Sequence, residues 1–279
     1  MNPWNMKIVA DSSSDVLAIE KIPYASVPLK ISTSEKEYVD NAELDVWEMT
    51  EDLLHYTGKS GSACPGVGDW IDAFDEATYV FVVTITSNLS GSYASAMVAK
   101  QVYEENHPDR KVFVIDSLST GGEMKLIIEK LEELIDSGLS FEEVCAAVTK
   151  YQEHAELLFM LESLQNLANN GRVSHLAAKA VGILGIRVVG RASDVGTLEQ
   201  LSKCRGEKKG LTALFQYMKD YGFAGGKVRI GHCFNEGAAE KLKEMIRAEF
   251  AAANIEVFGL RGLTSFYAEK GGLIVGYEK

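Results

Sequence analysis

The chain has 279 residues, of which 46% are hydrophobic and 24% charged, a composition typical of a globular protein that is long enough for two domains. Its formal net charge of -12 at pH 7 argues against a general nucleic-acid or anionic-membrane surface, because such surfaces need concentrated Lys and Arg. No segment approaches the length of apolar sequence that spans a membrane, so a cytoplasmic protein with at most transient membrane contact is expected.

The first half of the chain alternates between two kinds of pattern. Three short apolar runs predict buried parallel strands at residues 6–10, 79–85 and 111–115. Segments with helical spacing follow at residues 70–74, 91–105, 124–136 and 141–151, the last opened by a capping box of Ser140 and Glu143. This alternation predicts a doubly wound α/β domain.

A second unit is expected to begin near residue 155. Strands are predicted at residues 157–162, 186–190, 228–232, 255–260 and 273–277. Helices are predicted at residues 164–169, 208–221 and 238–253, and a segment of small apolar residues occupies 174–184. We therefore expect two α/β domains, residues 1–155 and 156–279, although the strand order of the second cannot be read from the pattern.

Cysteine spacing argues against a metal site. No C-x-x-C pair occurs among the four cysteines, which are Cys64, Cys145, Cys204 and Cys233. The simpler interpretation is that all four are buried free thiols. His232 and Cys233 are neighbours in a predicted strand and would point to opposite faces. No metal and no cofactor is therefore expected.

Hydroxyl-rich loops follow the three strands of the first half, at residues 11–15, 86–92 and 116–122. Ligands of parallel sheets bind beyond the carboxyl ends of the strands, and each loop leads into a helix whose first-turn amides favour an anion. The three loops together predict a carboxylate or phosphate pocket. Ser and Asp are also common helix caps, and that structural interpretation stays open for each loop.

The sequence disfavours both a serine hydrolase and a nucleotide-binding fold. Ser90 precedes a glycine after a strand, but its context is N-L-S-G and not G-x-S-x-G, and no histidine is placed as a general base. Neither G-x-G-x-x-G nor G-x-x-x-x-G-K-[ST] occurs, which disfavours a nucleotide fold.

These loops, in this order, resemble those of the DegV family of bacterial fatty-acid-binding proteins. The sequence D-S-S-S-D at residues 11–15 is similar to the family's D-S-T-x-D, and S-A-C-P at 62–65 stands where the family has T-S-Q-P. I-T-S-N-L-S-G-S at 85–92 is similar to I-S-S-x-L-S-G-T, and N-G-R-V-S at 170–174 is similar to G-G-R-I-S. The similarity extends over nearly the whole chain.

The resemblance implies an N-terminal domain with a parallel sheet flanked by helices, a C-terminal domain with a mixed sheet, and a tunnel between them for one acyl chain. It implies that the ligand's carboxylate is bound by Ser62 and Ser90, with Gly91 and Ser92 nearby. Hydroxyls and helix-terminal amides are suitable donors to a carboxylate. The family's late histidine, which meets the carboxylate, is replaced by Tyr267.

The resemblance also matches Arg205 to a family arginine, with a role in either carboxylate neutralisation or partner docking. Together these features predict a protein that binds a long-chain fatty acid and presents the carboxylate to the ATP-binding subunit of a fatty acid kinase, without catalysing a reaction itself. Two alternatives remain: a carrier of another amphiphile, and an enzyme acting on a small acyl or phosphorylated substrate in the same crevice.

Overall fold

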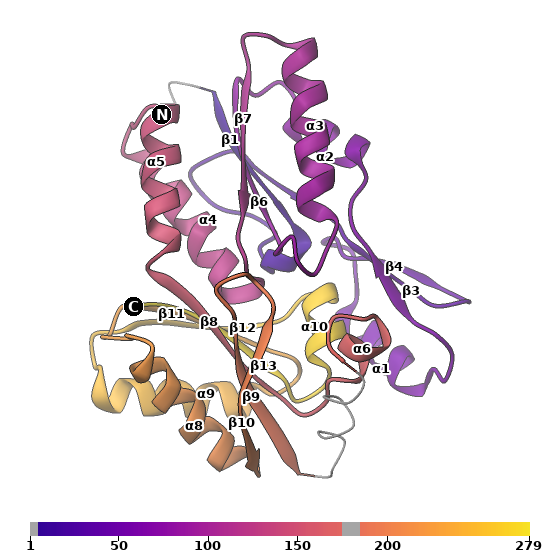
Figure 1. The fold of residues 1–279 in the computed structure, drawn as a ribbon, viewed down its shortest axis with the longest axis vertical. Helices are drawn as coiled ribbons and strands as arrows, with labels where there is room; N and C mark the ends of the chain where they lie inside the picture. Colours follow the sequence, from indigo (N-terminus) through magenta and orange to yellow (C-terminus); the bar gives the residue numbers. More distant parts are fainter. Residues whose placement is uncertain (1–4, 175–184) are drawn as a thin grey trace.

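The computed structural model describes residues 5–174 and 185–279, and in this part of the chain two main β-sheets and a smaller third sheet are covered by helices (Figure 1). The sheet of the first half (sheet A) lies at the top of Figure 1, and the sheet of the second half (sheet C) lies at the bottom, with α4 (Gly121–Asp136) close to both. Residues 175–184 of the predicted small-residue segment lie outside the described residues.

Sheet A is parallel throughout, which confirms the prediction. Its spatial order is β2 (Tyr24–Val27), β1 (Met6–Asp11), β6 (Tyr79–Thr84) and β7 (Lys111–Asp116). Successive side chains of a strand point to opposite faces, so Val9 packs with α2 (Val67–Phe74) and α3 (Ser92–Asn106), while Ile8 packs with α4 and α5 (Phe141–Gln152). The capping box of Ser140 and Glu143 is present at the start of α5.

Sheet C is mixed, as the resemblance implied. Its spatial order is β10 (Leu198–Arg205), β9 (Ile186–Ala192), β8 (Ala155–Leu161), β13 (Leu273–Glu278), β11 (Lys227–His232) and β12 (Asn254–Gly259). Only the β11–β12 pair is parallel. Leu158 and Met160 pack on one face with α8 (Glu207–Asp220) and α9 (Glu236–Glu249), which leaves the other face toward sheet A.

A third sheet, the strands β2 and β10, and two helices were not predicted from the sequence. The small sheet has the order β4 (Glu37–Val39), β3 (Lys30–Ser32) and β5 (Gly61–Ala63). Ile31 and Tyr38 pack in one small core with Met49 of α1 (Val46–His55) and Phe266 of α10 (Gly262–Ala268). Strands of three residues are too short to show a periodic pattern, which is why the sequence did not indicate them.

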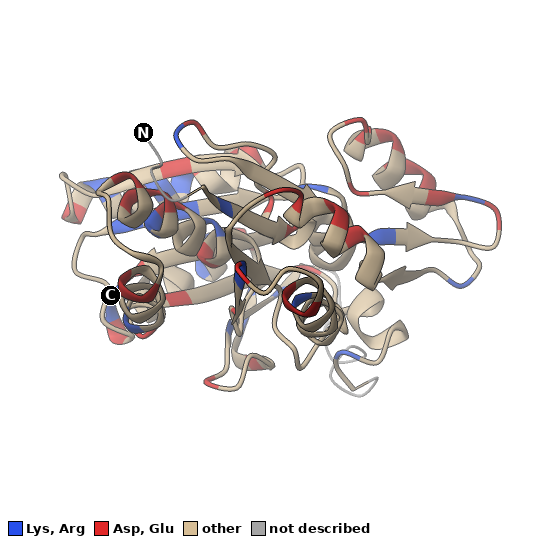
Figure 2. Cartoon of the chain, turned by 90° about the horizontal axis from the view of Figure 1, so that it is seen from above, with Lys and Arg blue, Asp and Glu red and all other residues tan. Residues whose placement is uncertain are grey.

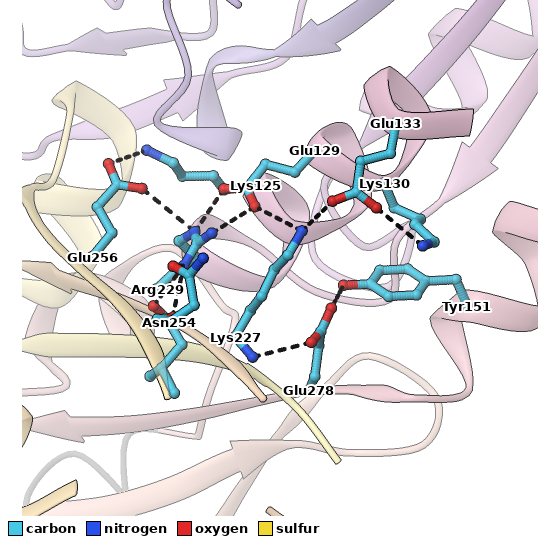
Figure 3. A network of polar contacts seen from close by, with 11 residues as sticks. Lys125, Glu129, Lys130, Glu133, Tyr151, Lys227, Arg229, Asn254, Glu256 and Glu278 are labelled. Atoms are coloured by element: carbon cyan, nitrogen blue, oxygen red, sulfur yellow. Dashed lines mark hydrogen bonds and ion pairs between the residues drawn. The ribbon is translucent and has the colours of Figure 1, made fainter. Parts of the chain in front are cut away.

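The two halves are joined tightly along α4. Arg229 of β11 is 5% exposed, and its guanidinium donates to both carboxylate oxygens of Glu129, at 2.6 and 2.7 Å. Figure 3 shows this pair inside a network of charged residues that extends from α4 to β11, β12 and β13. A Cβ on Gly122 would lie 2.4 Å from the Arg229 carbonyl oxygen, so the backbones of α4 and β11 are nearly in contact.

The predicted domain boundary near residue 155 falls between α5 and β8. Helices α4 and α10 each pack against elements from the other half of the chain, so the division into two domains at this boundary stays a prediction. Within residues 5–174 and 185–279, none of the helices is both long and apolar enough to cross a membrane. Figure 2 shows Asp and Glu distributed over helices and loops of both halves.

Candidate functional site

A pocket lies between the carboxyl edge of sheet A and the open face of sheet C. It holds about 820 Å³ of space free of atoms, part of which is open solvent. Its lining combines loops that follow β6 and β7 with side chains from β8, β13 and α10. The pocket therefore forms only when the two halves of the chain come together.

Most of the pocket wall is apolar. Leu157, Phe159 and Leu161 point into it from alternate positions of β8, and Ile274 of β13 lies on the same face of the sheet. Over this run β8 extends about 13 Å, because a strand rises about 3.3 Å per residue. A wall of this length and character suits a hydrocarbon chain.

Polar side chains gather where β8 leads into α6 (Gln165–Asn169). The hydroxyls of Ser62 and Tyr267 are hydrogen-bonded to each other at 2.7 Å, although they are 205 residues apart in sequence. Ser90 also lines this pocket, and its Oγ accepts a hydrogen bond from the backbone N–H of Ser92 at 3.2 Å. Burial raises the pKa of Tyr267 above its ordinary value, so its hydroxyl is neutral and able to donate a hydrogen bond.

Arg172 supplies a cation to this polar end. Its Nε donates to the carbonyl oxygen of Leu89 at 3.1 Å and its Nη1 to that of Asn170 at 2.6 Å, while the guanidinium lies 5.8 Å from the centre of the Tyr267 ring. Among the described residues, no carboxylate forms an ion pair with Arg172. Its charge is therefore available to an anion in the pocket.

Arg191 also lines the pocket, but its charge is directed elsewhere. It is paired with Leu158 across β8 and β9, and Leu158 faces α8. The Arg191 guanidinium lies over the Tyr221 ring at 4.9 Å and forms an ion pair with Glu199 at 2.7 Å. Arg191 thus contributes mainly backbone to the pocket wall, and the guanidinium of Arg172 is the better placed of the two.

The D-S-S-S-D loop organises the site without lining it. Asp11 is fully buried, and its Oδ2 accepts hydrogen bonds from the backbone N–H of Ile85 at 2.9 Å and from the Ser92 hydroxyl at 2.6 Å. Its Oδ1 accepts from the backbone and side chain of Ser13. Burial raises the pKa of Asp11, and these hydrogen bonds oppose the rise. One carboxyl group therefore ties the end of β1 to the β6 loop and to the start of α3.

Two further carboxyl groups hold α10, the helix that carries Tyr267. Asp40 accepts hydrogen bonds from the backbone N–H groups of Gly262 and Leu263, at 2.8 and 2.9 Å. Asp15 accepts from the Arg261 N–H at 2.7 Å, and burial raises its pKa to about 7. Carboxylates stabilise the N-terminal turn of a helix, so residues from the first half of the chain place a side chain of the second half in the pocket.

The structure brings together three of the six predicted site residues. Ser62, Ser90 and Tyr267 line the pocket, whereas Gly91 is not among its lining residues. The Ser92 hydroxyl points into the core and donates to Asp11, so its side chain has a structural role, although it does not cap α3.

Arg205 does not lie at the pocket. It is exposed at the end of β10 and is not among the residues that line the pocket. This position favours partner docking over carboxylate neutralisation, and the role of Arg205 stays a prediction. Arg172 was missed as a site residue, although the N-G-R-V-S motif contains it.

The cysteine prediction was correct in part. All four cysteines are free, but Cys64 is exposed and only Cys233 is buried. Cys64 follows the short strand β5 at the molecular surface, a position that could not be inferred without the small sheet. Among the described residues there is no group of three or more His, Cys, Asp or Glu side chains arranged to hold a metal ion.

Comparisons with known proteins agree with the sequence motifs. Residues 5–279 match the sequence model of a protein family that is described as the uncharacterised DegV family. A DegV domain-containing protein of Streptococcus pneumoniae is 48% identical over 276 residues, which are 98% of this chain and 98% of that protein.

Two solved structures are close to this one over nearly their whole length. A DegV family protein from Eubacterium eligens, loaded with heptadecanoic acid, has a TM-score of 0.96 and 45% identity, with 98% of this chain and 99% of that chain covered. The fatty acid kinase (Fak) B3 protein of Streptococcus pneumoniae, loaded with linoleic acid, has a TM-score of 0.96 and 47% identity, with the same coverage.

Proposed function

Because the chain belongs to the DegV family, we propose that its pocket binds one long-chain fatty acid and presents the carboxylate to a fatty acid kinase. The acyl chain lies along the apolar wall of β8. The carboxylate lies at the polar end, within reach of four side chains: Ser62, Ser90, Arg172 and Tyr267.

The observation that carries this proposal is the position of Arg172. An anionic ligand in a protein of net charge -12 needs a local cation, and this guanidinium has no carboxylate partner among the described residues while it borders an apolar pocket. One cationic, hydroxyl-rich end and one apolar wall correspond to the two parts of a fatty acid. Each methylene group that leaves water contributes about 0.8 kcal/mol, so the tail supplies affinity and the head sets orientation.

The kinase step follows from this arrangement. A kinase subunit that binds ATP transfers the γ-phosphoryl group to a carboxylate oxygen, so that ADP leaves and an acyl phosphate remains in the pocket. Arg172 is placed to bind the added negative charge. This protein supplies binding and orientation in the cytoplasm, and the partner supplies the phosphoryl-transfer chemistry.

Docking of the kinase is assigned to a basic patch that comprises Arg205, Lys208 and Lys209. All three side chains are exposed, and none forms an ion pair with another described residue. The patch surrounds the start of α8, away from the pocket lining. A cationic patch on an acidic protein suits a complementary acidic surface on a protein partner.

A non-catalytic role is supported by the chemistry of the lining. The described lining residues include hydroxyls and two arginines but no His, Asp, Glu or Cys, so a serine there has no general base beside it. The alternative of a different amphiphile keeps one supporting observation, the replacement of the family's histidine by Tyr267. Identification of the natural ligand distinguishes a fatty-acid carrier from a carrier of another amphiphile.

Native mass spectrometry of the freshly purified protein, followed by analysis of its organic extract, tests the proposal. We expect one fatty acid per chain, retained under native conditions and released on denaturation. A different amphiphile in the extract would replace fatty acid with that ligand class, and an empty protein that also fails to take up added fatty acid would refute the proposal.

The headgroup assignment has its own test in the double variant Ser62→Ala/Ser90→Ala. Loss of two hydrogen bonds to a charged group is expected to weaken fatty-acid binding by about 3 kcal/mol, measured by isothermal titration calorimetry. Ser87→Ala, an exposed serine of the same β6 loop, is the matched control and should bind like the unaltered protein. Unchanged affinity in the double variant would exclude these hydroxyls as carboxylate ligands.

A further inference from the structure

Phe159 lies midway along the apolar wall of the pocket. Leu161 precedes the segment that leads into α6, so it marks the polar end of the wall. Leu158 pairs with Arg191 of β9, which lies just before the turn at residues 193–197, and this turn marks the far end. Phe159 lies between these limits and lines the pocket. Its ring therefore lies beside the middle of any chain that extends along β8.

The ring of Phe159 rests on a glycine. Gly190 is the partner of Phe159 in the neighbouring strand β9, and a Cβ placed on Gly190 would lie 2.3 Å from Cζ and 2.7 Å from Cε2 of the ring. Carbon atoms do not approach so closely, so the ring occupies the space that any other side chain would fill. The same Cβ would lie 2.4 Å from the carbonyl oxygen of Glu199, so this space is bounded by backbone on its other side.

This packing determines how far the ring projects from the sheet. Phe159 lies against the backbone of β9, and it is 5% exposed. A side chain at residue 190 would displace the ring, and since backbone blocks the sheet side, the ring would move into the pocket. The contact between Phe159 and Gly190 thus keeps the middle of the pocket open.

Given the proposed fatty-acid function, on which this step rests, we propose that the Phe159–Gly190 pair sets the width of the pocket at mid-chain. The width determines how well a bent, cis-unsaturated chain binds relative to a straight, saturated chain. A straight chain needs only a narrow channel, whereas a cis double bond displaces the chain sideways and requires space at the bend. The pair is therefore a specificity determinant for chain shape, separate from the carboxylate-binding residues.

The test compares oleic acid, which is bent, with stearic acid, which is straight and has the same number of carbons. Phe159→Ala widens the pocket and should raise the ratio of oleic to stearic affinity about tenfold, because one methylene group in a tight apolar pocket changes selectivity by at least that factor. Gly190→Ala raises the ring and should lower the ratio about tenfold. Phe159→Trp narrows the pocket with a larger ring and should lower the ratio as well.

Met160→Ala is the matched control. Met160 is also buried on β8, but it faces α8, so its truncation should reduce thermal stability without changing the ratio. If Gly190→Ala does not fold, Phe159→Ala and Phe159→Trp should still shift the ratio of oleic to stearic affinity in opposite directions, and this comparison tests the role of Phe159.

The outcomes separate this inference from the proposed function. Opposite shifts of the ratio in the widened and narrowed variants support the assignment. An unchanged ratio in both Phe159 variants, while stearic and oleic acid continue to bind, would overturn the role of Phe159 and leave fatty-acid binding intact. If the unaltered protein binds neither acid, the proposed function itself fails.

Discussion

The positive charge at the polar end of the pocket comes from Arg172, a residue whose two observed hydrogen bonds go to carbonyl oxygens. These bonds fix the guanidinium in position without neutralising it. Arg205, which the sequence resemblance had nominated, is exposed at the end of β10. The roles of the two arginines therefore differ because Arg172, in the turn after α6, lines the pocket and Arg205 does not.

Substitution of each arginine should separate binding from partner docking. Arg172→Ala is expected to weaken fatty-acid binding by about 2 kcal/mol, since a hydrogen bond to a charged group is lost. Arg205→Ala should leave that affinity unchanged and reduce acyl-phosphate formation with the kinase. Calorimetry and a coupled kinase assay measure the two effects, and the same loss of ligand affinity in both variants would contradict the assignment.

The buried hydroxyl of Tyr267 leads to a prediction about the pH dependence of fatty-acid binding. Burial raises the pKa of its hydroxyl above the ordinary value, so Tyr267 does not titrate near neutral pH. The Tyr267 hydroxyl should therefore contribute no pH dependence to fatty-acid affinity between about pH 6 and about pH 8. Tyr267→His should bind more tightly at the lower pH, because an imidazole with a pKa of about 6.5 is cationic there and loses that charge as the pH rises.

Binding measured across this pH range checks the expectation. A pH-dependent affinity in the unaltered protein would show that another group near the carboxylate titrates. A flat profile in Tyr267→His would show that residue 267 does not contact the ligand.

Among the elements, the turn at residues 193–197 between β9 and β10 closes the far end of the pocket. A Cβ on Gly196 would lie 2.2 Å from the Thr86 hydroxyl and 2.9 Å from Cα of Leu118, so this turn packs directly on the loops of sheet A. Gly196 has a φ of 74°, which favours glycine. The side chain of Asn88 also holds the turn, by a hydrogen bond to the carbonyl oxygen of Val195 at 2.7 Å.

Removal of that hydrogen bond should loosen the turn. Asn88→Ala is expected to increase the rate of fatty-acid release several-fold, since a net hydrogen bond contributes about 1 kcal/mol to the closed arrangement. Stopped-flow transfer of a fluorescent fatty acid to an acceptor measures the rate. Ser87→Ala, in the same loop, is the control, and equal release rates in all three proteins would mean that the turn does not limit release.

At the scale of the whole molecule, the halves are joined through buried charge as well as apolar packing. Glu123 in the first turn of α4 lies where that helix meets β13, and a Cβ on Gly276 would lie 2.2 Å from the Glu123 backbone nitrogen. Burial raises the pKa of Glu123 to about 7. The folded protein thus retains a proton there that the unfolded chain releases at lower pH.

This proton makes the free energy of unfolding depend on pH. Because the folded pKa lies above the unfolded value of 4.5, the stabilising contribution is complete below that value and is lost as the pH rises through about 7. The total loss is about 3 kcal/mol at one pKa unit per 1.4 kcal/mol. Glu123→Gln should remove this part of the dependence, so its stability relative to the unaltered protein should increase from about pH 5 to about pH 8.

Urea unfolding of both proteins at the two pH values measures the difference. Parallel changes in the variant and the unaltered protein would show that Glu123 does not account for the pH dependence.

The sequence by itself determined the local structure of this protein and the family to which it belongs. The apolar runs that became β1, β6 and β7 were recognisable because both faces of the parallel sheet are buried, and the Ser140–Glu143 capping box acts within a single helical turn. The family motifs likewise depend on short runs of residues. Ser62 and Ser90 could be named as candidate site residues for this reason.

The tertiary structure alone decided which residues meet. Ser62 and Tyr267 form a hydrogen bond across 205 residues of sequence, and Arg172 reaches the Leu89 carbonyl across 83. No periodic pattern encodes such pairs, because the pairing of distant strands and helices depends on how the two sheets pack. For the same reason the sequence did not show that Arg172 lines the pocket while Arg205 does not, and the space above Gly190 became visible only when β8 and β9 lay side by side.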